Sequence, residues 1–295
     1  MSTEYKIIKP TQQEYPNILK QIHKPPAKLY YKGHLDVLDL TCIAIVGTRK
    51  YSEYGEYVTR KIIEELSLYK VAIVSGLAKG IDTIAHKTCL ETNTPTIAVL
   101  GSGINNIYPQ ENKKLAEKIQ ESGLTISEHP DLTAPIKHHF PQRNRVISGI
   151  SIATLVVEAP EKSGALITAR FALEQNREVF TTPGDIDRIN SRGPLNLIQR
   201  GAAFPVSSGH EIIETLSLQP SLPSIFSPKN KEKTTSALTE NEEQILLTLS
   251  KTRGLLIDQI YSKIELPLQQ LLTTISLLEI KSLIKIRDGK YFRKC

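Results

Sequence analysis

The sequence predicts an α/β fold, in which an extended Rossmann-like, doubly wound and mainly parallel sheet precedes a small C-terminal winged-helix-like domain. Short apolar runs rich in β-branched residues recur along residues 42–206, and helical patterns separate them. Strand, helix and strand at this spacing imply right-handed crossovers and parallel pairing. After residue 216 the composition changes, and three further helical patterns and a hairpin pattern follow.

The predicted strands are nearly continuous in apolar character, as expected for strands that are buried on both faces. In chain order they are CIAIVG (42–47), VAIVSG (71–76), TIAVLG (96–101), LTISE (124–128), IATLVVE (152–158) and EVFTT (178–182). AAFPV (202–206) is a seventh, and Pro205 places it at an edge of the sheet because proline donates no hydrogen bond to a neighbouring strand.

Helical patterns fill the gaps between these runs. The first carries apolar residues at spacings of 4, 4 and 3: Val58, Ile62, Leu66 and Tyr69. The second, PQENKKLAEKIQES (109–122), has proline at its start and Gly123 just past its end, which are typical helix boundaries.

The chain is expected to have two folded domains. The predicted segments are an N-terminal lead-in (1–40), a Rossmann-like domain (41–216), a linker rich in serine and proline (217–238) and a winged-helix-like domain (239–295). The last segment begins with a capping box from Thr239 to Glu242, and Asp288-Gly289 marks the tip of its hairpin.

Composition narrows the class of protein. A net charge of +6 and a pI of about 9.0 mildly favour polyanionic partners. The 3 cysteines are scattered and form no CxxC pair, which indicates a reducing compartment and argues against a thiolate metal site. The polar N-terminus is no signal peptide, and no run of about 18 apolar residues occurs. We therefore expect a cytoplasmic protein with no membrane association.

Polar or glycine-rich loops follow four of the predicted strands, at the edge where ligands bind to open parallel sheets. They are GTRKYSEYG (47–55), SGLAKGID (75–82), GSGINNIYP (101–109) and EAPEKSGALITA (158–169). Together they favour a phosphate-binding face. No P-loop motif is present, and Asn106 stands where a dinucleotide fingerprint requires glycine, so no cofactor is expected. His138 and His139 are adjacent and rarely converge on one ion, so no metal is expected either.

One pair of residues has the types needed for catalysis. Asp82 and His86 lie one helical turn apart and are either an acid/base dyad or a structural pair near a helix start. We favour the structural interpretation and assign no catalytic residue, because a motif without its geometry is only a hypothesis.

The segment HHFPQRNRVISG (138–149) concentrates positive charge around an aromatic ring, and no carboxylate occurs between Asp131 and Glu158. We expect it to form a loop at the ligand-binding edge. There Arg143 and Arg145 would meet phosphates and Phe140 would stack on a base, which is how proteins hold single-stranded nucleic acid without regard to sequence. The alternative is a buried Phe140 that anchors the loop, with two solvated arginines.

These segments together resemble the DNA-processing protein A family (DprA, also called Smf), from about residue 15 to residue 213. The segments that carry the resemblance are IAIVGTRKYSEYG, VSGLAKGIDTIAH, TIAVLGSGINNIYP, SEHP, FPQRNRVISGIS, VVEAPEKSGALITARFALEQ, VFTTPG and GPLNLIQRGA. The resemblance implies a homodimer that binds and protects single-stranded DNA. It also implies that the protein loads the RecA recombinase onto that DNA during natural transformation. Independently of the resemblance, no metal or nucleophile motif accompanies Asp82 and His86, so we expect that the protein is no enzyme.

The resemblance also suggests DNA-binding residues. Those that match family motifs are Gly47, Thr48 and Arg49 in the phosphate-binding turn, Phe140, Arg143, Asn144 and Arg145 in FPxRNR, and Ser163 and Gly164 in SGxLITA. Lys137, just before the basic segment, is expected to add charge, and Asn144 to order the loop.

Other interpretations stay open. A Rossmann-like enzyme that acts on a nucleotide or nucleoside phosphate would use the same glycine-rich loops, but it would not need the basic, aromatic segment around Phe140. A scaffold with a docking module is a third possibility. The predicted recognition helix LPLQQLLTTISLLEIKS (266–282) has Lys281 as its one basic residue, so we expect residues 239–295 to contact protein rather than read duplex DNA.

Overall fold

The computed structural model describes most of the chain, in two compact units that comprise Met1–Leu222 and Pro223–Cys295. The described residues are 4–218, 239–250, 254–264, 266–281, 283–287 and 289–294. From residue 219 on, the predicted linker lies outside the described residues.

Among the described residues, the N-terminal unit forms a 9-stranded sheet in the order β1-β2-β6-β5-β4-β3-β7-β8-β9. The strands are β1 (Lys6–Ile8), β2 (Leu29–Gly33), β3 (Thr41–Val46), β4 (Val71–Ser75), β5 (Thr96–Leu100), β6 (Leu124–Ser127), β7 (Ala153–Val156), β8 (Glu178–Thr181) and β9 (Phe204–Pro205). Pairing is parallel from β6 across to β9 and antiparallel at β1 and β2. The predicted strands are confirmed, including Pro205 in an edge strand, whereas β1 and β2 were not predicted.

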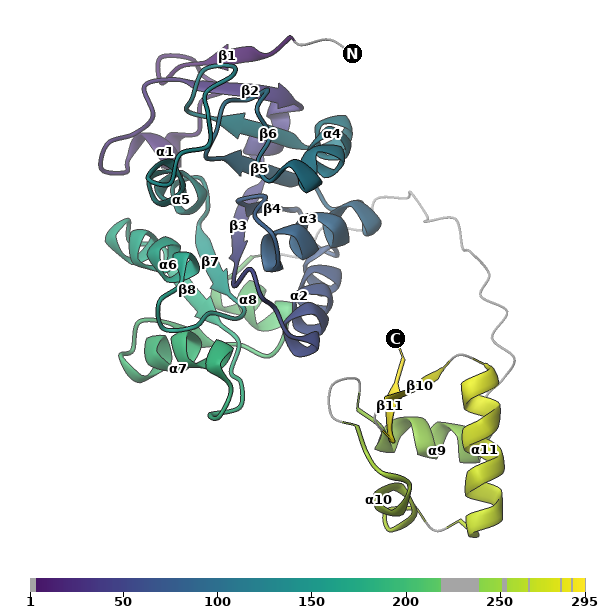
Figure 1. Ribbon diagram of the computed structural model, residues 1–295. Coiled ribbons are helices and arrows are strands. Elements are labelled where there is room, and N and C mark those ends of the chain that lie inside the picture. The colour runs from purple at the N-terminus through teal and green to yellow at the C-terminus, as the bar shows by residue number, and fades with distance from the viewer. Residues whose placement is uncertain are drawn as a thin grey trace. The chain divides into compact units, whose positions relative to one another are not determined.

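Helices cover both faces of this sheet, as Figure 1 shows. Their bounds are α1 (Asn17–Lys20), α2 (Glu53–Leu66), α3 (Ile81–Glu91), α4 (Lys113–Ser122), α5 (His139–Gly149), α6 (Gly164–Glu174), α7 (Arg192–Gln199) and α8 (Gly209–Thr215), with 3₁₀ turns η1 (Leu35–Asp39), η2 (Gln110–Asn112) and η3 (Ile189–Ser191). The two predicted helices are confirmed as α2, which ends before Tyr69, and as η2 with α4, which ends at Ser122 with Gly123 as its C-cap.

The segment 138–149 was expected to be a loop, and that prediction was wrong: it forms helix α5. Pro141 does not prevent this, because it lies in the first helical turn, where backbone N–H groups have no partner within the helix. The apolar residues that fix the helix lie toward its C-terminal end, where Val146 and Ile147 are fully buried.

The core confirms that the central strands are buried on both faces. In β3, Ala44 and Val46 belong to a cluster with residues of α5 and α6. Ile43 and Ile45, which alternate with them, belong to a second cluster with residues of α2 and α3. Successive side chains of a strand point to opposite faces, so the continuous apolar run serves both helical layers.

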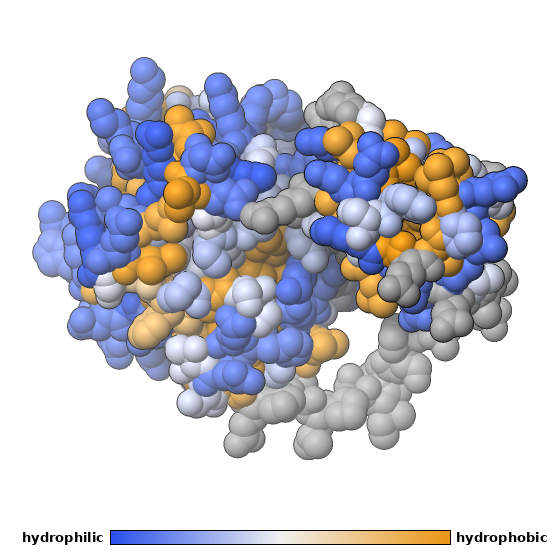
Figure 2. All heavy atoms as spheres, turned by 90° about the horizontal axis from the view of Figure 1, so that it is seen from below, coloured by the Kyte–Doolittle hydropathy of each residue, from blue (hydrophilic) through white to orange (hydrophobic). Residues whose placement is uncertain are grey.

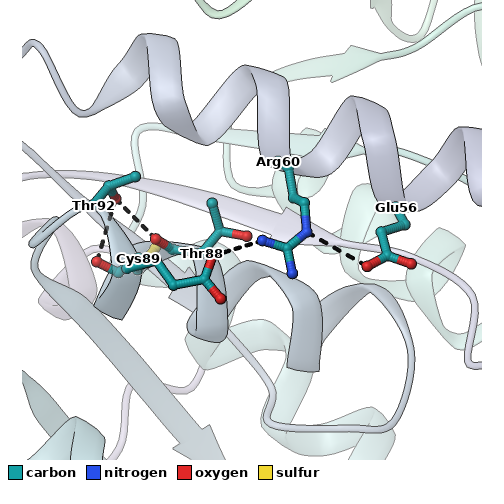
Figure 3. Close-up of polar contacts among 6 residues, drawn as sticks. Glu56, Arg60, Thr88, Cys89 and Thr92 are labelled. Atoms are coloured by element: carbon teal, nitrogen blue, oxygen red, sulfur yellow. Dashed lines mark hydrogen bonds and ion pairs between the residues drawn. The ribbon is translucent and has the colours of Figure 1, made fainter. Parts of the chain in front are cut away.

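Helices α2 and α3 lie side by side and are joined by polar contacts at their surface (Figure 3). Arg60 donates to Glu91 at 2.6 Å and to Glu56 at 3.4 Å. Thr92 caps α3 by donating to the carbonyl of Thr88 at 2.9 Å. Exposed ion pairs of this kind contribute about 0.2–1 kcal/mol each, so the buried side chains between the helices dominate their packing.

The C-terminal unit contains α9 (Glu240–Thr248), α10 (Ile257–Tyr261) and α11 (Leu268–Ile280), followed by the hairpin of β10 (Ile284–Arg287) and β11 (Lys290–Arg293). The capping box from Thr239 to Glu242 is confirmed. Lys281 donates to the carboxylate of Glu242 at 2.7 Å, so it is engaged within the unit. Several leucines are exposed here, among them Leu247, and apolar side chains are visible on this unit in Figure 2.

Within the part of the chain that the structure describes, no helix has both the length and the apolar character needed to cross a membrane.

A candidate nucleic-acid interface

A cleft of about 720 Å³ opens at the carboxyl ends of the central strands. It lies where the chain order reverses, since β3 is followed by β4 on one side and is paired with β7 on the other. The loops that follow β3, β4, β5 and β7 all contribute lining residues, as does α5. Such a switch point is where open α/β sheets bind their ligands.

The structure brings together almost all of the predicted DNA-binding residues. Those that line the cleft are Gly47, Thr48, Arg49, Lys137, Phe140, Arg143, Asn144, Ser163 and Gly164. Arg145 is not among the lining residues, and it pairs with Glu128 at 2.5 Å, at the end of β6. The structure therefore separates the two arginines that the sequence led us to treat alike.

The turn after β3 is fixed by its backbone. The N–H of Thr48 donates to the carbonyl of Glu158 at 2.6 Å, and the carbonyl of Thr48 accepts from the N–H of Ile81 at 3.2 Å. Gly47 is required here, because a Cβ atom at this position would lie 2.5 Å from the side chain of Ile81. This turn presents the exposed Arg49 side chain at the cleft without the need to reorder the loop.

Arg143 lies at the floor of the cleft and is only 6% exposed. Its Nη1 donates to the carbonyl of Gly76 at 2.6 Å and also to the carbonyl of Val99, so it joins the ends of β4 and β5. A Cβ atom on Gly76 would lie 2.6 Å from Nη2, so the guanidinium fills the space that this glycine leaves.

Burial lowers the pKa of Arg143 to about 10, although the carboxylate of Asp82 acts to raise it. The guanidinium is therefore still charged at neutral pH. Because Nη1 donates to two strand-end carbonyls and Nε donates to the side chain of Asn144 at 3.2 Å, Arg143 differs from the exposed phosphate ligand that the sequence suggested.

Asp82 and His86 are engaged by different partners. The carboxylate of Asp82 accepts from the backbone N–H groups of Gly76 at 3.1 Å and Ala78 at 3.4 Å. Burial raises the pKa of Asp82, while Arg143 and these N–H groups act to lower it. The Nδ1 atom of His86 lies 2.8 Å from the hydroxyl of Thr96, on β5. This geometry supports the structural interpretation of the pair.

The burial of His86 makes the stability of the protein depend on pH. Burial lowers the pKa of its imidazole from 6.5 to about 3. Between these values the unfolded chain binds a proton that the folded chain does not, so stability is lost as pH falls. We expect the wild type to lose about 2 kcal/mol more than a His86→Gln variant between pH 7 and pH 5, measured by urea unfolding.

The exposed His23 offers a matched control. A His23→Gln variant should keep the pH dependence of the wild type. If His86→Gln also kept it, the imidazole would titrate alike in the folded and unfolded states, which would contradict its burial as a neutral group.

Phe140 is half-buried. It is therefore neither fully exposed for stacking on a base nor fully buried as an anchor, the two alternatives that the sequence left open. A Cβ atom on Gly101 would lie 2.8 Å from its ring, so the ring covers the end of β5. The same ring lies 5.5 Å from that of Tyr108, at an interplanar angle of 50°. Phe140 also lines the cleft, so it combines partial anchoring with an accessible aromatic surface.

The N-terminus of α6 forms the opposite wall. The Ser163 hydroxyl accepts from the N–H of Ala165 at 3.3 Å and caps the helix. Asn144 donates to the carbonyl of Gly164 at 3.1 Å and thereby ties α5 to α6. The expectation that Asn144 orders its surroundings thus agrees with its contacts. A Cβ atom on Gly164 would meet nothing within 4 Å, so this backbone faces open space.

The charge of the cleft is positive. Arg49, Lys137 and the unpredicted Lys162 are exposed lining residues, and none of them forms an ion pair with another described residue. Asp82 is the single acidic residue among the described residues that line the cleft, and it is buried. Such a surface attracts phosphates.

Among the lining residues missed at the sequence level, two have side chains suited to contact with nucleic acid. Tyr108 belongs to GSGINNIYP and Lys162 to EAPEKSGALITA, both of which were placed at the ligand-binding edge. Their position in those loops was the only sequence feature that could have identified them as site residues. Elsewhere in the described parts of the chain, no group of three His, Cys, Asp or Glu side chains is arranged to hold a metal ion.

Comparisons with known proteins identify relatives of this chain. The family described as DNA recombination-mediator protein A matches residues 6–217. The chain is 44% identical over 205 residues to DNA processing protein DprA from Bacillus subtilis, and the match covers 69% of each protein. It is 46% identical over 217 residues to Protein Smf from Synechocystis, which covers 72% of this chain and 54% of that protein. The match therefore spans about half the length of the Synechocystis relative.

Solved structures agree with this result. DNA processing protein A from Streptococcus pneumoniae superposes with a TM-score of 0.69 at 41% identity, covering 72% of this chain and 74% of that one. DNA processing protein A from Helicobacter pylori, from a study of its single-stranded DNA binding mode, gives a TM-score of 0.66 at 30% identity. That match covers 74% of this chain and 98% of the other.

Proposed function

Because this chain belongs to the DNA recombination-mediator protein A family, we propose that it binds single-stranded DNA in the cleft and acts as a recombination mediator. The observation that carries the proposal is a half-buried aromatic ring, Phe140, in one cleft with three exposed cations that pair with no other described residue: Arg49, Lys137 and Lys162. Aromatic surfaces combined with positive charge hold single strands through stacking and phosphate contacts, with little dependence on sequence.

The lining residues divide into three roles in this proposal. Arg49, Lys137 and Lys162 contact phosphates, and Phe140 stacks on a base. Gly164 offers backbone that a strand can approach closely at the start of α6, and Gly47, Thr48 and Ser163 line the cleft at the turn after β3 and at the cap of α6. Asn144, Arg143 and Arg145 hold the walls and floor in place through the contacts described above.

The biological role proposed here follows the family. The bound strand is protected and handed to the RecA recombinase during natural transformation, which takes place in the cytoplasm. The relatives in Bacillus subtilis and Streptococcus pneumoniae, named as DNA processing proteins, support the DNA-processing part of this role, and the single-stranded DNA binding mode of the Helicobacter pylori protein supports the binding of single strands.

We also propose a homodimer. The outer edge of β9 is unpaired among the described residues, and Phe204 in this strand is 54% exposed. A hollow of about 270 Å³ lies beside it, lined in part by Leu173 and Ala203. Exposed apolar side chains beside a hollow, here Phe204 and Leu173, favour a self-complementary contact between two copies. Light scattering at tens of micromolar should give the mass of two chains, and a monomer alone would contradict this part of the proposal.

The C-terminal unit is proposed to be a winged-helix-like module that contacts protein. Its support is the ion pair of Lys281 with Glu242, which leaves the predicted recognition helix without a free cation among its described residues. Exposed leucines on the same helix, Leu268 and Leu272, suit a protein surface better than a DNA groove.

The experiment that tests the function compares three fluorescent probes by anisotropy: oligo-dT, a duplex of the same length and a mononucleotide, each at two salt concentrations. We expect the oligo-dT to bind most tightly and to lose affinity as salt rises. A chain that ends at Leu218 should bind within a few fold of the full chain, because every lining residue of the cleft precedes that position. Leu216 and Leu218 are kept because they pack against the core.

Two outcomes would contradict the proposal. Tight binding of the mononucleotide, with no gain for the oligonucleotide, would favour an enzyme that acts on a small phosphate ligand. A hundredfold loss of affinity on shortening the chain would move the DNA site into residues 239–295.

A further inference from the structure

The loop after β5 places a second aromatic ring beside Phe140. Tyr108 lines both the main cleft and a smaller hollow of about 40 Å³ next to it, and its side chain is 43% exposed. Among the described residues, its hydroxyl forms no hydrogen bond that would explain why a polar aromatic side chain stands here. The two rings touch at a centroid distance of 5.5 Å, and the contact leaves Tyr108 partly exposed to solvent.

This loop is held rigidly. Ser102 donates to the carbonyl of Asn106 at 2.6 Å within the loop. Asn106 donates to the carbonyl of Thr133 at 3.3 Å, in the segment after β6 that leads to Lys137. On the other side, Asn112 donates to the carbonyl of Leu77 at 2.9 Å, in the loop after β4. Tyr108 is therefore anchored from both sides before any ligand arrives.

Cations flank Tyr108 as well. Arg49 and Lys79 line the same small hollow as the ring. Lys79 is exposed and pairs with the exposed Glu111 at 2.8 Å, a contact that costs little to exchange for a phosphate. The positive charge of the main cleft thus continues past Phe140 toward Tyr108.

We propose that Tyr108 is a second base-stacking platform, so that successive bases of the bound strand stack on Phe140 and then on Tyr108. This inference rests on the proposed single-strand binding and adds to it the path of the strand, which runs across the cleft from Phe140 to Tyr108. A base cannot enter between the two rings, because they already touch. The second base therefore lies on the outer surface of Tyr108, with the phosphate that follows near Lys79.

Substitutions separate stacking from simple support of Phe140. Tyr108→Ala and Tyr108→Leu should each weaken oligo-dT binding about 5- to 150-fold, which corresponds to 1–3 kcal/mol per stacked base. Tyr108→Phe should bind like the wild type, since it keeps the aromatic surface. Tyr261 in the C-terminal unit is exposed to a similar extent, at 47%, so Tyr261→Ala is the matched control and should change nothing.

A second measurement locates the base. Oligo-dT that carries 5-iodouracil should cross-link to Tyr108 under ultraviolet light, as identified by mass spectrometry of the peptides. Wild-type affinity in Tyr108→Leu, or cross-links that never include Tyr108, would overturn the inference and leave Tyr108 as a support for Phe140. A wild-type chain that fails to bind oligo-dT would overturn the proposed function itself, and this inference with it.

Discussion

Replacement of Arg143 by alanine is expected to lower the free energy of unfolding by about 3–5 kcal/mol, the range for removal of one partner from a buried charge pair. The guanidinium is buried, it joins the carbonyls of Gly76 and Val99, and it lies in the field of the buried Asp82. Without it, two carbonyls and a carboxylate lose their nearest positive charge. Urea unfolding at neutral pH measures the effect.

The control is Arg49→Ala, which removes an exposed arginine from the same cleft and should leave the free energy of unfolding within about 0.5 kcal/mol of the wild type. Arg143→Lys should recover part of the stability, since it keeps the charge but loses the planar fork. An Arg143→Ala protein of normal stability, with a weaker salt dependence of DNA binding, would instead make Arg143 a direct phosphate ligand.

Replacement of Phe140 by alanine is expected to weaken oligo-dT binding by about 1–3 kcal/mol while the salt dependence stays nearly unchanged, because stacking involves no counterion release. The ring is only half-buried over Gly101. The loss of folding stability should therefore be smaller than the roughly 3–5 kcal/mol of a fully buried phenylalanine.

Phe140→Leu provides the control, since it keeps apolar bulk over Gly101 but removes the aromatic surface. Its melting temperature should be close to that of the wild type, whereas its affinity for oligo-dT should be as low as that of Phe140→Ala. If Phe140→Ala both melted and bound normally, neither stacking nor anchoring would describe the ring. A large loss of stability with unchanged binding per folded molecule would make it a core anchor alone.

The sheet was predictable because its central strands are buried on both faces and so read as continuous apolar runs, as in β3 and β4. Strands β1 and β2 carry no such signal, since β1 is mostly exposed and β2 is buried only over its first residues. Helix α5 was missed because its first half is basic and contains a proline, and only its second half is buried.

The position of the cleft followed from the rule that ligands bind at the carboxyl ends of parallel strands. The different roles of Arg143 and Arg145 could not follow from the sequence. In a loop both side chains could reach the same ligand, whereas two residues apart on a helix they point about 160° away from each other, toward nearly opposite sides. The hole that receives Arg143 is formed by Gly76, just after β4, a contact between residues far apart in the chain.

The most direct test of DNA binding in this cleft is the salt dependence of oligo-dT affinity in the wild type and in Arg49→Ala, with Arg60→Ala as the control. Arg60 is an arginine on α2 that is already paired with Glu56 and Glu91. If the strand lies in the cleft, Arg49→Ala should weaken binding to all sequences and reduce the slope of log affinity against log salt by roughly 0.7, the value for one lost phosphate contact. Arg60→Ala should leave both unchanged. An Arg49→Ala protein with the affinity and slope of the wild type would place the DNA elsewhere on the molecule.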